Sequence, residues 1–252
     1  MTLVNFRDPA ALADPEGRWV RHGVLHRSAQ PFPADDASIV EQLNAAGVRT
    51  IIDLRGGAEA DDADWAQSQA AGIEVVAARV QPTDRKLEAA MMEMTTDADL
   101  GHFYLLMVES APGAVKLAVE AATRPGGLLV HCAAGKDRTG WLTALLLDLL
   151  GVPAEEIVAD YHRTTAALPQ IFEGLAERNR NALNDYHAGS LTIPRQLLEA
   201  PADSMAAFLD LVRARYGGTE GLLAHCGVDA ATIEAFRAKA GTGAVETAEV
   251  TA

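Results

Sequence analysis

Short apolar segments alternate along the chain with longer ones in which apolar residues recur every three or four positions. The apolar segments at 48–55, 73–78 and 127–130 predict buried strands. Helical spacing predicts helices over 35–46, 58–71, 86–107 (broken near residue 95), 112–123 and 140–150. We therefore expect an α/β fold with a central, mostly parallel sheet flanked by helices.

The two ends of the chain have different patterns. Residues 19–28 predict a hairpin that turns near Gly23. Beyond Gly151 the pattern is almost wholly helical, with Pro153 at the first position of one helix. Further helices are expected over 168–183, 204–216, 220–224 and 230–240. Residues 1–240 are expected to form one domain, followed by a disordered tail over 241–252 that is small, acidic and without apolar periodicity.

Composition narrows the classes of function. The 252 residues are 49% hydrophobic, which suffices for one large core. Thirty-five acidic against twenty-one basic side chains give a net charge of −14, which argues against a nucleic-acid partner. Neither a signal peptide nor an apolar segment of about 18 residues is recognised, so no integral membrane association is expected. With two cysteines in the chain, a disulfide framework is improbable and a cytoplasmic location is expected.

Candidate chemistry concentrates in residues 131–140, HCAAGKDRTG, between a predicted strand and a predicted helix. The backbone N–H groups of such a loop surround one point and favour an anion there. The same positive potential should hold Cys132 as a thiolate, the nucleophilic form of cysteine. Arg138 can bind two phosphoryl oxygens at once. These parts describe phosphoryl transfer through a cysteinyl-phosphate, for which no metal and no cofactor is expected.

The remaining loop residues have supporting roles in this interpretation. Thr139 can place a hydroxyl near the sulfur and assist its departure in a second step. His131 is expected to fix the Cys132 backbone by a hydrogen bond. Gly135 allows a positive φ or a close approach to the ligand. The phosphate would be bound mainly by the backbone of Ala133, Ala134, Gly135, Lys136 and Asp137.

The sequence HCxxGKDRT resembles the signature loop of the cysteine-dependent protein tyrosine phosphatases. It is most similar to the bacterial tyrosine/serine phosphatases, a group that includes phosphoinositide-active members. Further similar segments are Asn5-Phe6-Arg7-Asp8, Arg27-Ser28, and Asp53-Leu54-Arg55 with Glu59. The chain departs from the family at 9–11, where it has Pro-Ala-Ala in place of Leu-Gly-Gly. The resemblance extends from residue 5 to about residue 240. It implies a protein-tyrosine-phosphatase-like fold and a phosphatase acting on phosphotyrosine, with phosphoserine, phosphothreonine or phosphoinositides as further substrates.

Loss of the phosphoryl group leaves an alkoxide or phenolate that needs a proton. Related phosphatases supply it from an aspartate on a mobile loop, and Asp84 occupies that place in the sequence. The alternative role of Asp84 is to cap the helix that follows it, and the two roles are compatible. Asp137 is the rival acid. Beside a bound dianion it must be either a protonated acid or a hydrogen-bonded clamp on the loop.

Three other features leave alternatives. Lys136 could bind a second phosphate, as on an inositol ring, or offset Asp137. Asp53 and Arg55 are expected to form an ion pair that supports the loop rather than to act in catalysis. Arg7 and Arg27 are expected to pair with Asp8 or neighbouring acids rather than to contact phosphate.

A second His-Cys pair, His225-Cys226, provides an internal test. Thr232 stands where the arginine would fall, and no strand precedes the pair. Cys226 is therefore predicted to be a packed thiol. The remaining hypotheses are a non-catalytic phosphate-binding module, against which the intact Cys132 and Arg138 count, and a sulfurtransferase, which needs no arginine at this spacing. The sequence indicates no oligomeric state.

Overall fold

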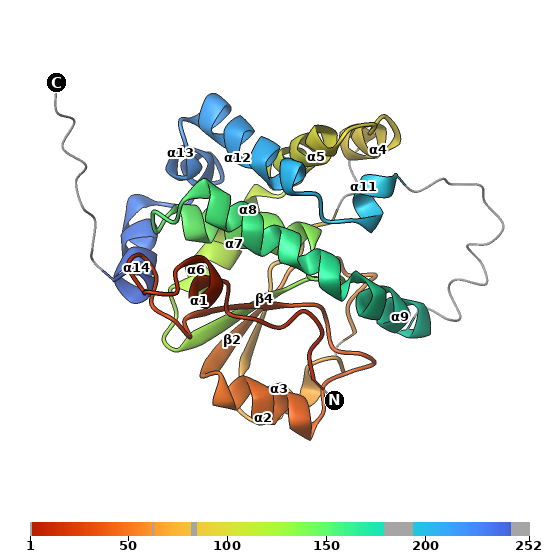
Figure 1. Ribbon diagram of the computed structural model, residues 1–252. Coiled ribbons are helices and arrows are strands. Elements are labelled where there is room, and N and C mark those ends of the chain that lie inside the picture. Colours follow the sequence, from red (N-terminus) through yellow and green to blue (C-terminus); the bar gives the residue numbers. More distant parts are fainter. Residues whose placement is uncertain (1, 62, 82–84, 179–193, 243–252) are drawn as a thin grey trace.

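A parallel sheet of four strands forms the centre of the molecule in the computed structural model, which describes residues 2–61, 63–81, 85–178 and 194–242 (Figure 1). The strands are β1 (Leu25–Ser28), β2 (Val48–Asp53), β3 (Glu74–Ala77) and β4 (Gly127–His131). Their order is β1-β4-β2-β3, and every pairing is parallel. The predicted α/β fold with a central parallel sheet is confirmed.

Helices cover both faces of this sheet. They are α1 (Pro9–Ala13), α2 (Ala37–Ala45), α3 (Ala66–Ala70), α4 (Arg85–Met92), α5 (Asp97–Ser110), α6 (Pro112–Ala122), α7 (Asp137–Asp148), α8 (Ala154–His162), the 3₁₀-helix η1 (Arg163–Ala167), α9 (Leu168–Arg178), α11 (Arg195–Leu198), α12 (Ala202–Tyr216), α13 (Thr219–His225) and α14 (Ala230–Ala240). In Figure 1, α2 and α3 lie below the sheet, and α7 and α8 lie above it.

The central strand β4 explains this layering. All five of its residues are buried, as expected for a parallel strand covered on both faces. Leu129 belongs to the small apolar cluster formed with residues of α2 and with Trp65, the N-cap of α3. Leu128 and Val130 face the larger cluster on the other side, where α7 packs against α5, α8 and α12. The carboxyl end of β4 therefore opens between two well-packed layers.

The predicted hairpin at 19–28 is wrong. Residues Leu25–Ser28 form β1, which pairs in parallel with β4, and the antiparallel neighbour of Arg27 is Arg7. Residue Val20 instead forms a bridge with Gly241 near the other end of the chain. The local pattern identified a strand but not its partners, because the partners are distant in sequence.

The predicted helix over 58–71 shortens to α3, Ala66–Ala70. Carboxylates before it bind backbone N–H groups in turns: Asp61 accepts from Ala63 N at 2.9 Å, and Asp64 from Asp61 N at 3.0 Å. Such local bonds compete with helix formation. The described residues 56–61, 63 and 64 form turns and irregular backbone rather than a helix.

Most other boundaries agree with the predictions. The expected break before α5 coincides with a capping box at Thr96. Pro153 is the N-cap of α8 rather than its first residue, and the short α11 was not predicted. The end of the helix predicted over 168–183 and the predicted tail beyond residue 242 lie outside the described residues. No helix in the described part of the chain is long and apolar enough to cross a bilayer.

Candidate active site

The loop of residues 132–136 connects the carboxyl end of β4 to the first turn of α7. Cys132 is the first residue after β4 and is only 2% exposed. His131 pairs in register with Ser28 of β1 and Asp53 of β2, so the two neighbouring strands end beside it. The sheet thus places the cysteine at the carboxyl edge of its two central strands, below the N-terminus of a long buried helix.

The carbonyl oxygens of this loop are held from behind. Gly135 O accepts from Arg27 Nη2 at 2.8 Å and from Asn5 Nδ2 at 3.3 Å, and Ala133 O accepts from Gln30 N at 3.1 Å. The backbone N–H groups of residues 133–137 donate to no acceptor within the described ranges. Because the donors are left unpaired on one side, the loop forms a concavity suited to an anion.

Gly135 is required by this shape. Its φ is +66°, and a Cβ built there would lie 2.2 Å from Ser28 O. A side chain would therefore push the loop away from β1.

Arg138 is held in place by a carboxylate. Its Nη1 and Nη2 donate to Glu59 at 2.5 and 2.7 Å, and Nη1 also lies 3.3 Å from Val80 O. Burial lowers the pKa of Arg138, but the bond to Glu59 and the negative charge of Cys132 outweigh it and raise that pKa. The guanidinium remains charged, and its orientation is fixed before any ligand arrives. Sequence reasoning named Glu59 within the resemblance but did not assign it this role.

Two further side chains of this segment, Cys132 and Thr139, carry groups available for chemistry. Cys132 carries a free thiol, and Thr139 Oγ1 is buried without a hydrogen-bond partner among the described residues. A buried hydroxyl without a partner is costly unless something else binds it. Cys132 begins the loop that follows β4, and Arg138 and Thr139 lie in the first turn of α7, where the loop ends.

His131 lies below the loop, fully buried. Trp65 Nε1, which can only donate, lies 3.0 Å from His131 Nε2, so the ring proton is on Nδ1. Nδ1 lies 3.2 Å from Cys132 O, the backbone contact expected from the sequence. Burial is the main reason that the pKa of His131 is lowered, and the ring is therefore neutral. The Trp65 contact was not predicted, since nothing in the local sequence links these residues.

Asp53 and Arg55 form a buried ion pair, with Arg55 Nη2 2.6 Å from Asp53 Oδ2. Arg55 also binds Asp64 at 2.6 Å, and Asp64 in turn binds Arg178 of α9. Burial raises the pKa of Asp53, but His131 and Arg55 outweigh it and lower that pKa to about 2. The pair is in the supporting position expected for it, next to His131.

Lys136 is buried, and its ammonium faces the protein. Nζ donates to the carbonyl oxygens of Gln196, Leu197 and Glu199 at 3.0, 2.9 and 2.5 Å. It also lies 3.3 Å from Asp137 Oδ1. A cation at the carbonyl end of α11 is favourable, and its three protons are already donated. The geometry favours the charge-offsetting alternative over binding of a second phosphate.

The carboxylate of Asp137 is also bound by neighbouring side chains. Tyr104 OH donates to its Oδ1 at 2.7 Å, and Tyr104 OH lies 2.7 Å from Tyr161 OH. Burial first, and then the charge of Asp137, raise the pKa of Tyr104 well above its usual value, so the phenol remains a donor. These bonds favour the clamp alternative for Asp137. Both tyrosines lie on apolar helix faces, and no sequence signal distinguishes them from core residues.

Arg7 and Arg27 form structural ion pairs, as expected, but their partner is not Asp8. Both bind Asp160 of α8, at 2.6 and 2.7 Å. Asp8 instead caps α1, accepting from Ala10 N at 2.8 Å. The pairing partner is more than 130 residues away, which local sequence cannot reveal.

Asp84 lies outside the described residues. Cys226 is the C-cap of α13, and burial, followed by the charge of Glu109, raises its pKa to about 11.

Comparison with known proteins agrees with this geometry. A sequence model described as the tyrosine phosphatase family matches residues 1–240. A protein of Nostoc commune named tyrosine-protein phosphatase is 30% identical over 239 residues, which are 93% of this chain and 79% of that protein. A Cupriavidus necator protein named as a candidate tyrosine-protein phosphatase is 36% identical over 166 residues, 64% of this chain and 60% of that protein. The triple specificity protein phosphatase PtpB of Mycobacterium tuberculosis is 32% identical over 123 residues, 46% of this chain and 44% of that protein. The matched segments thus span less than two thirds of the last two relatives.

Proposed function

The chain belongs to the tyrosine phosphatase family, and on this premise we propose that it hydrolyses phosphotyrosine monoesters through a phosphocysteine intermediate. The family match confirms the resemblance of the loop sequence HCxxGKDRT. One observation carries the proposal: the loop combines a free thiol on Cys132 with the unpaired backbone N–H groups of residues 133–137. Beside them stands the guanidinium of Arg138, whose orientation Glu59 fixes.

In the first step the Cys132 thiolate attacks phosphorus, an S–P bond forms, and the P–O bond to the leaving group breaks. The phosphoryl oxygens receive the loop N–H groups, and Arg138 adds two further donors. Preorganised donors of this kind act where negative charge is concentrated during the transfer. The dipole of α7 favours the same charge.

In the second step water attacks the phosphocysteine, inorganic phosphate leaves, and the thiolate is regenerated. Thr139 Oγ1 is buried and unpartnered, so it can donate to the sulfur as the S–P bond breaks. A hydrogen bond to the thiolate makes it a better leaving group.

For the general acid we propose Asp84. Asp137 is bound by Tyr104 and by Lys136, so its carboxylate is already engaged in holding the loop. Val80, four residues before Asp84, places its carbonyl oxygen 3.3 Å from Arg138 Nη1. This contact of Val80 with Arg138 supports the proposal.

Phosphoserine, phosphothreonine and phosphoinositides remain further substrates to be tested, and the relative named as a triple specificity protein phosphatase makes a broad panel worthwhile. The cytoplasmic location and the extent of the single domain stay predictions.

The decisive experiment measures phosphate release from a phosphotyrosine peptide, a phosphoserine peptide and a phosphoinositide. We expect Cys132→Ser to lower turnover of the phosphotyrosine peptide by at least about 10⁴-fold, since it removes the nucleophile. The matched control is Cys226→Ser, which changes the other buried cysteine. No turnover by the wild-type protein would refute the enzyme, and equal losses in the two variants would refute the mechanism.

The role of Asp84 as general acid is tested by comparing substrates with poor and good leaving groups. Asp84→Asn should slow hydrolysis of phosphotyrosine by about 10²-fold and that of an activated aryl phosphate much less, because a good leaving group needs no proton. Asp137→Asn is the matched control. If Asp137→Asn alone shows this selectivity, the acid is Asp137.

A further inference from the structure

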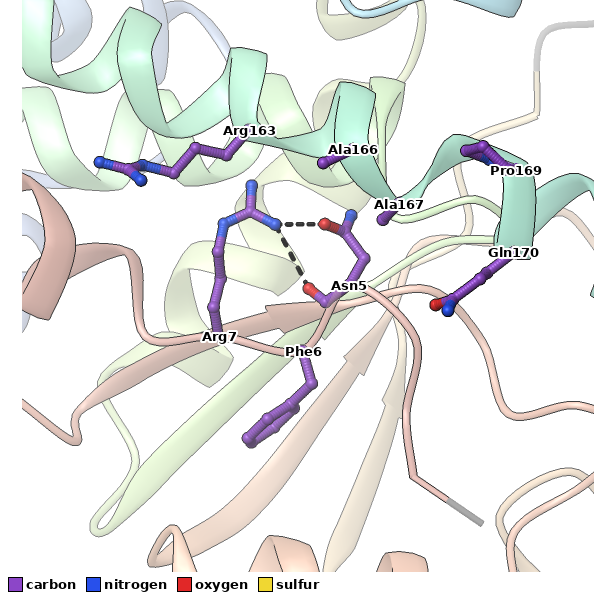
Figure 2. A pocket seen from close by; sticks show the side chains of 8 residues that line it. All are labelled: Asn5, Phe6, Arg7, Arg163, Ala166, Ala167, Pro169 and Gln170. Atoms are coloured by element: carbon purple, nitrogen blue, oxygen red, sulfur yellow. Dashed lines mark hydrogen bonds between the residues drawn. The ribbon is translucent and has the colours of Figure 1, made fainter.

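A second cavity lies behind the phosphate-binding loop, on the side where the loop's carbonyl oxygens are held. It has a volume of about 430 Å³ and opens between the N-terminal segment and the η1–α9 region (Figure 2). Its polar lining consists of Asn5, Arg7, Arg163 and Gln170. In Figure 2, Arg163 and Gln170 lie toward opposite ends of the group, and Arg7 extends upward toward η1 between them.

Positive charge is in excess around this cavity. Arg7 and Arg27 share the single carboxylate of Asp160, and Arg163 stands next to them without an ion pair to any described residue. Burial first, then the positive charge of Arg27 and, more weakly, that of Arg163, lower the pKa of Arg7 to about 10, although Asp160 opposes them. A buried cation that is incompletely neutralised is costly, and a bound anion would offset it. The concentration of arginines is notable in a chain whose net charge is −14.

The cavity also offers hydrogen-bond donors that no described residue uses. Arg163 and Gln170 are exposed, and their side chains make no hydrogen bond with the described residues. The wall between them is made of the small residues Ala166 and Ala167, which leave room for a ligand. The Arg163 guanidinium at one end of the lining and the Gln170 amide at the other are donors of the kind that suit a group with several anionic oxygens.

We propose that this cavity binds a phosphate group, separately from the one bound by the Cys132 loop. The proposal concerns binding and does not depend on turnover at Cys132. The phosphate could be the free ion or a second phosphoryl group on a phosphopeptide, and these sources share one recognition chemistry.

The cavity is connected to the catalytic loop through Asn5. Its Oδ1 accepts from Arg7 Nη1, as drawn in Figure 2, and its Nδ2 lies 3.3 Å from Gly135 O. Arg27, the second arginine on Asp160, also donates to Gly135 O. Phosphate in the cavity therefore acts on residues that support the rear of the loop.

The test uses the full chain carrying Cys132→Ser, titrated with inorganic phosphate and followed through backbone amide NMR signals. We expect two saturable sets of shifts, one at residues 133–137 and one at 166–170. Arg163→Gln should weaken the second set by about tenfold and leave the first within about twofold. Arg213→Gln, which removes an exposed arginine of α12, is the charge-matched control and should change neither. Absence of a saturable second set, or a second set unaffected by Arg163→Gln, would overturn the proposal.

A further pair of variants tests the cavity by repulsion. Ala166→Glu adds a carboxylate at an exposed position of the lining and should abolish the second set of shifts. Ala166→Gln adds a neutral side chain of the same size and should retain it. Equal loss in both variants would contradict recognition by charge.

The two sources of phosphate are separated with peptides. A peptide with two phosphotyrosines that binds about tenfold tighter than its singly phosphorylated form, with the gain lost in Ala166→Glu, identifies the second phosphoryl group as occupant. If the doubly and singly phosphorylated peptides bind equally well and inorganic phosphate still binds saturably at 166–170, the occupant of the cavity is the free phosphate ion.

Discussion

The chain contains the dipeptide His-Cys twice, at His131-Cys132 and at His225-Cys226, and the two copies have opposite surroundings. Cys132 follows a central strand and precedes the N-terminus of α7, whereas Cys226 is the C-cap of α13. Both thiols are free and buried. What differs is the end of the helix that each one adjoins and the charge next to it.

Around Cys132 the neighbouring groups are donors: the unpaired loop N–H groups, the unpaired Thr139 hydroxyl and the Arg138 guanidinium, which Glu59 holds in place. At Cys226, burial and then the carboxylate charge of Glu109 raise the pKa of the thiol to about 11. A helix N-terminus favours a negative charge and a C-terminus opposes it. Reactivity is thus assigned by position in the fold, not by the dipeptide.

The largest expected difference is in alkylation. At pH 7 a thiol with a pKa of about 11 is a thiolate only in about one part in 10⁴, so iodoacetamide should modify Cys132 about 10³-fold faster than Cys226 in the native protein. Modification of Cys226 should rise about tenfold with each pH unit up to about 11, because deprotonation increases with pH. Peptide mass spectrometry measures both rates. Inorganic phosphate should protect Cys132 alone, and equal rates at pH 7 would contradict the comparison.

The second largest expected effect is a loss of kcat/KM when the guanidinium of Arg138 is replaced. Arg138→Lys keeps the positive charge but removes the fork that both Glu59 and phosphate require, so we expect kcat/KM to fall by about 10²–10³-fold. The control is Arg237→Lys on α14, which alters an arginine bound to Glu220 and Glu234 and should change kcat/KM by no more than about twofold. Retained activity in Arg138→Lys would show that charge alone suffices.

A smaller difference separates two glycines. Gly135 and Gly227 both have positive φ, but a Cβ at Gly135 would meet Ser28 O at 2.2 Å, whereas at Gly227 its nearest neighbour is Lys116 Cδ at 3.8 Å. Gly135→Ala should lower the free energy of unfolding by about 2–4 kcal/mol, and Gly227→Ala by about 1 kcal/mol. Urea denaturation measures both. A reversed order would mean that β1 yields to the loop without cost.

The smallest expected effect is a null result that sharpens the comparison. Thr232→Arg completes the spacing Cys-x5-Arg at Cys226, and in the Cys132→Ser background it should restore no measurable phosphatase activity. The reason is that residue 232 lies on α14 and that a helix, α13, directly precedes Cys226 where a strand precedes Cys132. Any turnover above that of Cys132→Ser alone would show that spacing suffices without the strand–loop–helix frame.

Sequence reasoning succeeded where the determining contacts are local. The strands at 48–53, 74–77 and 127–131 and the helix that follows Cys132 come from apolar patterns within a few residues. The loop's shape also follows from short-range features, above all Gly135. It failed where contacts join distant segments: Arg7 and Arg27 with Asp160, Lys136 with the carbonyl oxygens after residue 195, and Trp65 with His131. Such pairings depend on how the layers stack, and one side chain's type does not reveal its partner.

The bonds of Lys136 have a consequence for the order of assembly during synthesis. The loop is supported by Asn5 and Arg27 from the first part of the chain and by the carbonyl oxygens of residues 196–199 from the last. Ribosomes add about 5–20 residues each second, so several seconds separate the emergence of Cys132 from that of its final supports. During this interval the nascent chain contains Cys132, but the C-terminal residues that support its loop have not yet been synthesised. Maturation of the loop therefore waits for the C-terminal helices, and a chain that ends before them keeps an unassembled phosphate-binding loop.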